Sequence, residues 1–458
     1  MMKIKKWLYI ANYILFVACL LISSFLANGE RIFGDHPTYL LTFKEVIIVF
    51  IILVTLLGTL IFLNIKYGKY KPNWILISLL GFLFLTSLIA LLTFKDYGTY
   101  SYEGIDGAIC TFDFSITSSL RATFIIESVA LLISTFLIFD VSYQIVNSKD
   151  LIKFISIFSI VIIFVFMLIS YITEFDKYIN LIPSLFKDGV YIDAPRSLFV
   201  SKNNYALVLT ISLIGFIFLH YFYKKWYFIA GAIFVYINIF FTTCKLLLIL
   251  DFLFVAAYLY SKLIRKFNDN KKKNTIIAIC SSSIIILAFI SAVIVLATTN
   301  KFTSIFNQDG YNTFVTRSWI WRRSIEAINM SNWFTGVGHN LFGEILFRLN
   351  TYDMVSQFPN NTKFAHNGFI EWLGNGGISM LLIGLFLLFV LYYIAIKNIK
   401  KRDELPLTSL FLLITFTLYM ALESATIILP KAFEAIVIST FIVTPTLAYY
   451  REVNITID

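Results

Sequence analysis

The stretch Lys363–Leu388, KFAHNGFIEWLGNGGISMLLIGLFLL, places polar residues at the mouth of a long apolar segment. On a helix, Asn367 and Glu371 share one face because they are four residues apart, and His366 lies next to them in the chain. Glycines within 374–377 leave room for another backbone or a ligand to come close. Ionisable groups at a membrane are costly unless they are paired or used, so the chemistry of the protein is expected here.

The composition is that of a membrane protein. The chain has 458 residues, of which 59% are hydrophobic and 14% charged, and its mean hydropathy is +0.82. A soluble protein has about a quarter charged residues. Apolar runs long enough to cross a hydrocarbon core of about 30 Å recur along the chain. We therefore predict an all-α polytopic fold with about twelve transmembrane helices. The expected spans are 7–27, 43–65, 74–94, 120–140, 152–172, 200–221, 226–242, 246–261, 275–297, 368–396, 407–423 and 432–450.

One block needs to be divided. Residues 226–260 are too long for a single span, and Thr242–Lys245 is their only polar break, so we expect two short helices that meet there. The chain then falls into three parts: nine transmembrane helices in 1–297, one large extracytoplasmic loop in 298–366, and three transmembrane helices in 367–458.

The net charge of +10 does not indicate nucleic-acid binding. Lysines and arginines gather in the short connections that would lie on one side of the membrane, as the positive-inside rule requires. Both termini are therefore expected in the cytoplasm. The sequence contains no metal-binding motif, glycine-rich phosphate loop or nucleotide fingerprint, so neither a metal nor a cofactor is expected.

The loop 298–366 contains an amphipathic pattern at 316–329, with Trp321, Ile325 and Ile328 on one stripe. Gly336 and Gly338 then predict a tight turn. The pattern is compatible with an interfacial helix whose arginines reach lipid phosphates, and with a helix whose arginines grip a phosphorylated lipid substrate. For Arg322, Arg323, Arg348 and Lys363, and for a second outer loop at 95–119, a solvated surface is the default expectation.

Several spaced residues resemble a known family. Arg317 is followed by Trp321 and the Gly336-x-Gly338 turn, then by His366-Asn367, with Gly377 eleven residues beyond the histidine. The segment 197–209 also contains an asparagine pair at the entrance of a helix. This pattern resembles the bacterial O-antigen ligase/polymerase superfamily. Two positions depart from it: Cys244-Lys245 stands where members often carry Ser-Arg, and His339 has no usual counterpart.

The resemblance implies a glycosyltransferase class C-like fold and a metal-independent glycosyltransferase. Such an enzyme is a multi-pass protein of the bacterial cytoplasmic (inner) membrane and moves glycan from undecaprenyl pyrophosphate on the outer face of that membrane. The leading hypothesis is a polysaccharide polymerase for capsule, exopolysaccharide or O-antigen, whose acceptor is another lipid-linked repeat unit. A ligase acting on lipid A core and a transporter or flippase are the alternatives. Expected partners are the lipid-linked oligosaccharide, membrane lipid and, for a polymerase, a chain-length regulator and a flippase.

The resemblance also gives the site residues. His366 is the expected general base for the acceptor hydroxyl, and Arg317 is expected to bind pyrophosphate, with a lipid-headgroup anchor as its alternative. Lys245 is a second phosphate cation or a helix-end charge. Glu371 orients His366, contacts sugar or pairs with an arginine. Further candidates for substrate contact are Asn367, Trp321, Arg196 and Asn204, and the role of His339 stays open.

Overall fold

The computed structural model describes residues 73–95, 97–103, 109–141, 148–185, 194–197, 202–266, 308–354, 364–399 and 404–423, with isolated positions in 51–66 and 442–447. The predicted spans 7–27 and 275–297 lie outside the described residues. The spans 43–65 and 432–450 are described only at isolated positions, so the number of twelve spans stays a prediction.

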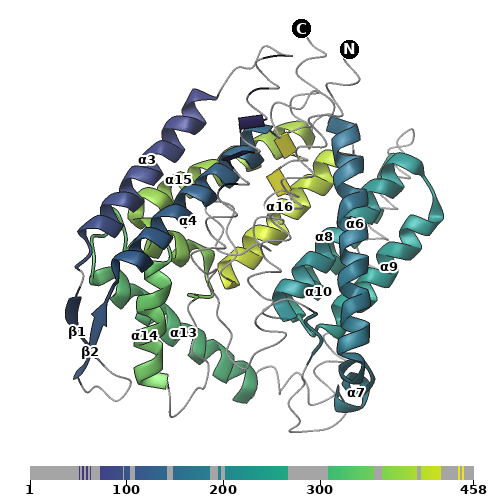
Figure 1. The fold of residues 1–458 in the computed structure, drawn as a ribbon. Coiled ribbons are helices and arrows are strands. Elements are labelled where there is room, and N and C mark those ends of the chain that lie inside the picture. Colours follow the sequence, from purple (N-terminus) through teal and green to yellow (C-terminus); the bar gives the residue numbers. More distant parts are fainter. Residues whose placement is uncertain are drawn as a thin grey trace.

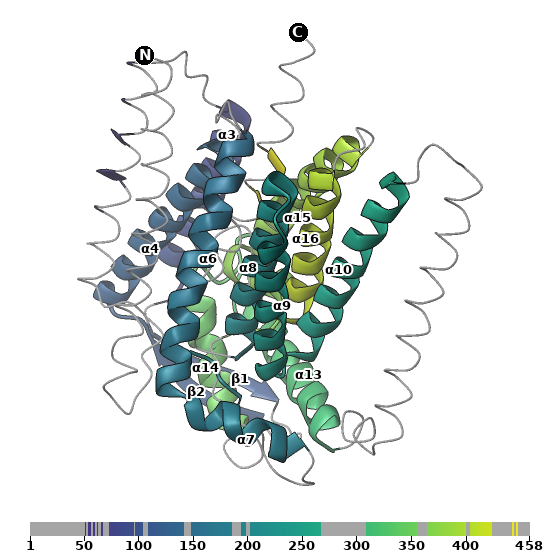
Figure 2. The ribbon, with the colours of Figure 1, turned by 90° about the vertical axis from the view of Figure 1, so that its right-hand side faces the viewer.

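Long apolar helices form the body of the molecule, and several of them run along a common axis in Figure 2. Within the described residues, five helices are long and apolar enough to cross a membrane, and three shorter apolar ones accompany them. The prediction of a polytopic membrane protein is therefore confirmed. The helices of the body are α3 (Trp74–Thr93), α4 (Ser118–Phe136) with a π-helical turn η1 (Leu137–Val141), α6 (Ser148–Thr173), α8 (Lys202–Tyr223), α9 (Trp226–Phe241), α10 (Lys245–Lys266), α15 (Gly368–Ile399) and α16 (Glu404–Leu422).

The predicted division of the block 226–260 is confirmed. Helix α9 ends at Phe241 and α10 begins at Lys245. The Thr242 hydroxyl donates a hydrogen bond to the Ile239 carbonyl at 2.7 Å, and Thr243 has a φ of 56°. A positive φ is uncommon for a β-branched residue, and it marks Thr243 as part of the turn between the two helices.

The remaining elements gather at one end of the bundle, here called the site end (Figure 1). Two of them, α7 and α14, and the hairpin were not predicted from the sequence, because they are short and depend on the packing of the helices above them. The elements are the antiparallel hairpin β1 (Tyr97–Glu103) and β2 (Ile109–Ser115), and the helices α7 (Phe175–Leu185), α13 (Gln308–Asn329) and α14 (Leu341–Met354).

The hairpin corrects the expectation of a wholly solvated loop at 95–119. Alternate side chains along a strand point to opposite faces, and on one face Tyr102, Phe112 and Phe114 are buried in a core shared with α13 and α14. On the other face Asp113 is exposed and accepts a hydrogen bond from Thr99 at 2.7 Å. The loop is therefore half structural and half solvated.

The buried face of α13 is wider than the predicted stripe. Of the predicted stripe, Ile328 is buried and Trp321 and Ile325 are half-buried. Ile320 and Ala327 are also buried, in the core that α13 shares with the hairpin. Arg323, predicted to be solvated, is buried: its guanidinium lies 4.7 Å from the centre of the Tyr102 ring and pairs with Glu326. The prediction for Arg323 was wrong because the sequence gives no sign of the hairpin that covers it.

Helix α15 is broken at Gly377, where φ is 67° and ψ is −163°. The loop 331–338 enters this break. The Val337 N–H donates to the Gly374 carbonyl at 2.9 Å, and the Ile378 N–H donates to the Trp333 carbonyl at 2.8 Å. A Cβ at position 377 would lie 2.3 Å from a carbonyl oxygen of this loop. The predicted close approach at these glycines is confirmed, and the backbone groups released by the break are satisfied by the inserted loop.

Candidate active site

Glu423 is the centre of a polar cluster at the site end. It follows the last residue of α16 and is buried, with 8% of its surface exposed. Its Oε1 accepts hydrogen bonds from Arg317 at 2.8 Å and from Asn203 Nδ2 at 2.7 Å. Its Oε2 lies 3.0 Å from Nδ1 of His366. One carboxylate thus joins α8, α13, α16 and the segment that leads into α15.

Two members of this cluster were predicted and two were not. Arg317 and His366 were the predicted phosphate ligand and general base, and the structure brings them to the same carboxylate. Glu423 was counted as the last residue of an apolar span, and Asn203 was passed over for its neighbour Asn204. The signal available in the sequence was an acidic residue at the end of an otherwise apolar run, which needs a partner when it is buried.

The cluster keeps Glu423 ionised. Burial raises the pKa of the Glu423 carboxyl, but the hydrogen bond with His366, the charges of His366 and Arg317, and the amide of Asn203 act in the opposite direction and together outweigh it. The pKa of Glu423 therefore lies below its ordinary value. A buried carboxylate of this kind is tolerated only because it is paired and hydrogen-bonded.

His366 is held in place through its backbone neighbours. It has a φ of 49°, a conformation that is uncommon outside glycine and that clusters at functional sites. Asn367 caps α15, because its Oδ1 accepts from the N–H groups of Phe369 at 3.0 Å and Ile370 at 3.2 Å. Its Nδ2 donates to the Ala421 carbonyl at 3.0 Å, two residues before Glu423. Asn367 thereby fixes the start of α15 against the end of α16.

Glu371, in the first turn of α15, supports the same segment. It is 1% exposed, and its Oε1 accepts a hydrogen bond from the Ala365 N–H at 2.6 Å. Its Oε2 accepts from Asn375 Nδ2 at 3.1 Å, and the Oδ1 of Asn375 accepts from the Asn340 N–H at 3.1 Å. Of the roles left open for Glu371, this geometry matches orientation of the residues that precede the histidine.

The turn between α9 and α10 adjoins the start of α8. Lys202 Nζ donates to the Thr243 hydroxyl at 2.9 Å. Lys202 directly precedes Asn203, so a second cation lies near the cluster. Burial raises the pKa of the Cys244 thiol to about 11, which keeps it protonated at neutral pH and unsuited to nucleophilic chemistry. Lys245 is the first residue of α10, and its side chain lies outside the described residues.

The other candidates have different surroundings. Arg196 is exposed, and its backbone N–H donates to Glu174 at 3.0 Å. Trp321 lies one turn after Arg317 and is half-buried, whereas the side chain of Asn204 lies outside the described residues. His339 is buried with 1% of its surface exposed, directly after the loop that enters the break of α15. Among the described side chains, no group of three or more His, Cys, Asp and Glu is placed to hold a metal ion.

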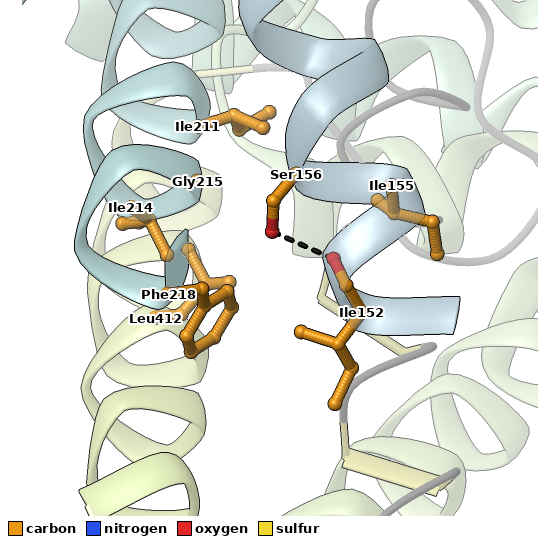
Figure 3. A pocket seen from close by; sticks show the side chains of 8 residues that line it. All are labelled: Ile152, Ile155, Ser156, Ile211, Ile214, Gly215, Phe218 and Leu412. Carbon is orange, nitrogen blue, oxygen red and sulfur yellow. Dashed lines mark hydrogen bonds between the residues drawn. The ribbon is translucent and has the colours of Figure 1, made fainter. Parts of the chain in front are cut away.

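An apolar cleft elsewhere in the bundle is unrelated to this cluster. It lies between α6, α8 and α16, and the only hydrogen bond drawn in it joins Ser156 to the Ile152 carbonyl of the same helix (Figure 3). Its residues on α6 belong to the first turns of that helix, at the end of the bundle away from Glu423. The cleft therefore lacks the polar groups that glycan transfer requires. Its lining residues are Ile152, Ile155, Ser156, Ile211, Ile214, Gly215, Phe218 and Leu412.

The segment that supplies Arg317 and His366 has recognisable relatives. Residues 246–389 match the family model for O-antigen ligase. The predicted resemblance to the O-antigen ligase/polymerase superfamily is confirmed over these residues, and the match indicates a membrane enzyme of the glycosyltransferase type. Asn203 and Glu423 lie outside the O-antigen ligase match. A comparison with curated proteins found no match.

Proposed function

We propose that this protein is a polysaccharide polymerase that joins lipid-linked repeat units on the outer face of the bacterial inner membrane. The observation that carries the proposal is the meeting of His366 and Arg317, both within the matched segment, at the carboxylate of Glu423. A base for an acceptor hydroxyl and a cation for a departing pyrophosphate are the two groups that this transfer needs.

In the proposed reaction, the acceptor hydroxyl oxygen attacks the anomeric carbon of the donor sugar. The bond between that carbon and the pyrophosphate oxygen breaks, and its electron pair leaves with undecaprenyl pyrophosphate. The hydroxyl proton passes to His366. Because Nδ1 faces Glu423, Nε2 is the nitrogen that takes this proton, and the carboxylate stabilises the imidazolium that results.

The departing pyrophosphate requires positive charge. Arg317 presents a guanidinium with 22% of its side chain exposed, and Lys202 lies at the neighbouring start of α8. Helices α8 and α10 both begin here, so the positive ends of their dipoles point towards the same region. Lys245 is a proposed further cation, and Trp321, Arg196 and Asn204 remain proposed substrate contacts. The polyprenyl chain would lie among the membrane helices.

A ligase that transfers finished glycan to lipid A core is the second candidate function. The description of the matched family, O-antigen ligase, favours it. Both reactions use the same donor and the same two groups, and they differ in the acceptor.

A reaction of the purified protein with a synthetic undecaprenyl-pyrophosphate repeat unit tests the proposal. Products are resolved on a gel, with and without a metal chelator, and with lipid A core added in a parallel reaction. A ladder of products that persists with the chelator is the expected result for a metal-independent polymerase.

Transfer that occurs only when lipid A core is present would replace the polymerase with the ligase. If neither reaction proceeds with folded protein and the natural repeat unit of the source organism, glycan transfer is excluded. Transport of the lipid-linked unit would then be measured in vesicles.

A further inference from the structure

Glu423 contacts both the proposed base and the proposed phosphate ligand, each through a different carboxylate oxygen. Oε2 faces His366, whereas Oε1 accepts both Arg317 and Asn203. Arg317 is therefore close enough to neutralise the same carboxylate that would support the imidazolium. A cation this close weakens the effect of the carboxylate on the histidine.

We propose that Arg317 moves from Glu423 to the pyrophosphate of the donor, so that Glu423 then acts on His366 alone and donor binding activates the base. This inference rests on the proposed function and adds that donor binding comes before activation of the base. The base becomes effective only when the donor is in place.

The geometry allows the exchange in two ways. Arg317 is the more exposed partner of the pair, with 22% of its side chain exposed against 10% for Glu423, so it can reach an incoming anion while the carboxylate stays buried. When Arg317 leaves, Asn203 Nδ2 still donates to Oε1 at 2.7 Å. The buried oxygen thus keeps a hydrogen bond, and the cost of removing its ionic partner is reduced.

Titratable groups on α8, on α10 and in the turn between α9 and α10 have hydrogen bonds or burial of their own. Among the described residues, Lys202 donates to Thr243, Cys244 is a protonated thiol, and Asp251 of α10 accepts from the Thr210 hydroxyl at 2.6 Å. In the described part of the chain, Glu423 has two ion-pair partners, Arg317 and, when protonated, His366. The displacement of Arg317 is therefore the change with the largest expected effect on His366.

The exchange is tested by chemical modification of histidine in the full-length protein. Diethylpyrocarbonate acylates neutral imidazole, so the pH dependence of modification at His366, read by mass spectrometry of its peptide, gives the protonation midpoint. Inorganic pyrophosphate is the probe, and its binding is measured separately with radiolabelled material. His366 has 34% of its side chain exposed, and His220, at the other end of α8, is an internal control.

Pyrophosphate is expected to raise the midpoint of His366 by about one pH unit and to leave that of His220 unchanged. In Glu423→Gln the shift should be much smaller, because only the direct effect of the anion remains. In Arg317→Gln the midpoint should already be raised without pyrophosphate, which gives a second reading if the Glu423 variant does not fold.

Pyrophosphate that binds without shifting His366 overturns the exchange and leaves the donor site standing. Equal shifts in the wild type and Glu423→Gln also overturn it, because the anion alone would then account for the effect. If pyrophosphate and the full lipid-linked donor both fail to bind, the proposed function fails with it.

Discussion

Two buried glutamates act on the region of His366: Glu423 contacts its ring, and Glu371 binds the backbone of the preceding residue. Their surroundings differ. Glu371 accepts hydrogen bonds from neutral groups, the Ala365 N–H and the Asn375 amide, and is 1% exposed. Glu423 instead faces an arginine and a histidine that are partly open to solvent. The described hydrogen bonds of Glu371 tie it to the backbone just before His366 and to its own helix. Partners of Glu423 that carry charge or can titrate are common at functional sites.

The largest expected effect is that of replacing His366 itself. Replacing His366 with Ala should reduce polymer formation by about 10²- to 10⁴-fold, because the acceptor hydroxyl loses its base. His220→Ala is the matched control, since this histidine lies at the opposite end of α8, near the Lys225 carbonyl, and should leave activity unchanged. The gel assay measures both. Unchanged polymer length in His366→Ala would end the general-base assignment.

Glutamine in place of each glutamate separates the two regions directly. Glu423→Gln should slow transfer by about 100-fold per folded molecule, as the loss of a partner that orients a reactive histidine does elsewhere. Glu371→Gln should chiefly lower stability, by roughly 1–3 kcal/mol, because a buried hydrogen-bonding group loses its match. The initial rate per folded molecule and thermal unfolding are measured for both variants. Equal losses of rate would remove the distinction between the two sites.

A third comparison uses two arginines of α13. Arg317→Lys should lower the transfer rate by about tenfold, since lysine keeps the charge and loses the planar, multiply donating guanidinium. Arg322 pairs with Glu103 at 3.0 Å on an exposed surface, so Arg322→Lys should change the rate by less than about twofold. Equal activity of Arg317→Lys and the wild type would favour the lipid-anchor interpretation of Arg317.

The smallest expected effect is on acid stability. The pKa of Glu423 is lowered by folding, so its contribution to stability is complete above the ordinary value of 4.5 and is lost as the pH falls through the lower folded-state value. The thermal midpoint should therefore fall below pH 4.5 in the wild type, and this part of the fall should be absent in Glu423→Gln. Glu103→Gln is the exposed control. Unfolding is followed by tryptophan fluorescence. Identical acid profiles in the wild type and Glu423→Gln would contradict the assigned ionisation.

Sequence periodicity and composition determined the apolar helices, because the bilayer itself requires a continuous apolar run in each span, whatever the tertiary contacts are. They also determined the break at Thr242–Lys245 and the close approach at Gly377, which depend on local polarity and on the absence of a side chain. Arg317 and His366 could be chosen because they match the pattern of the family that the chain resembles, within one matched segment.

The tertiary structure alone decided which side chains meet. Glu423 and Asn203 are separated by 220 residues, and Glu423 and Arg317 by 106, so no local pattern could pair them. The burial of Arg323 likewise depends on a hairpin from a distant part of the chain. Hydrophobic runs specify their environment one element at a time, whereas a polar cluster acquires its partners only when several helix ends have been packed together.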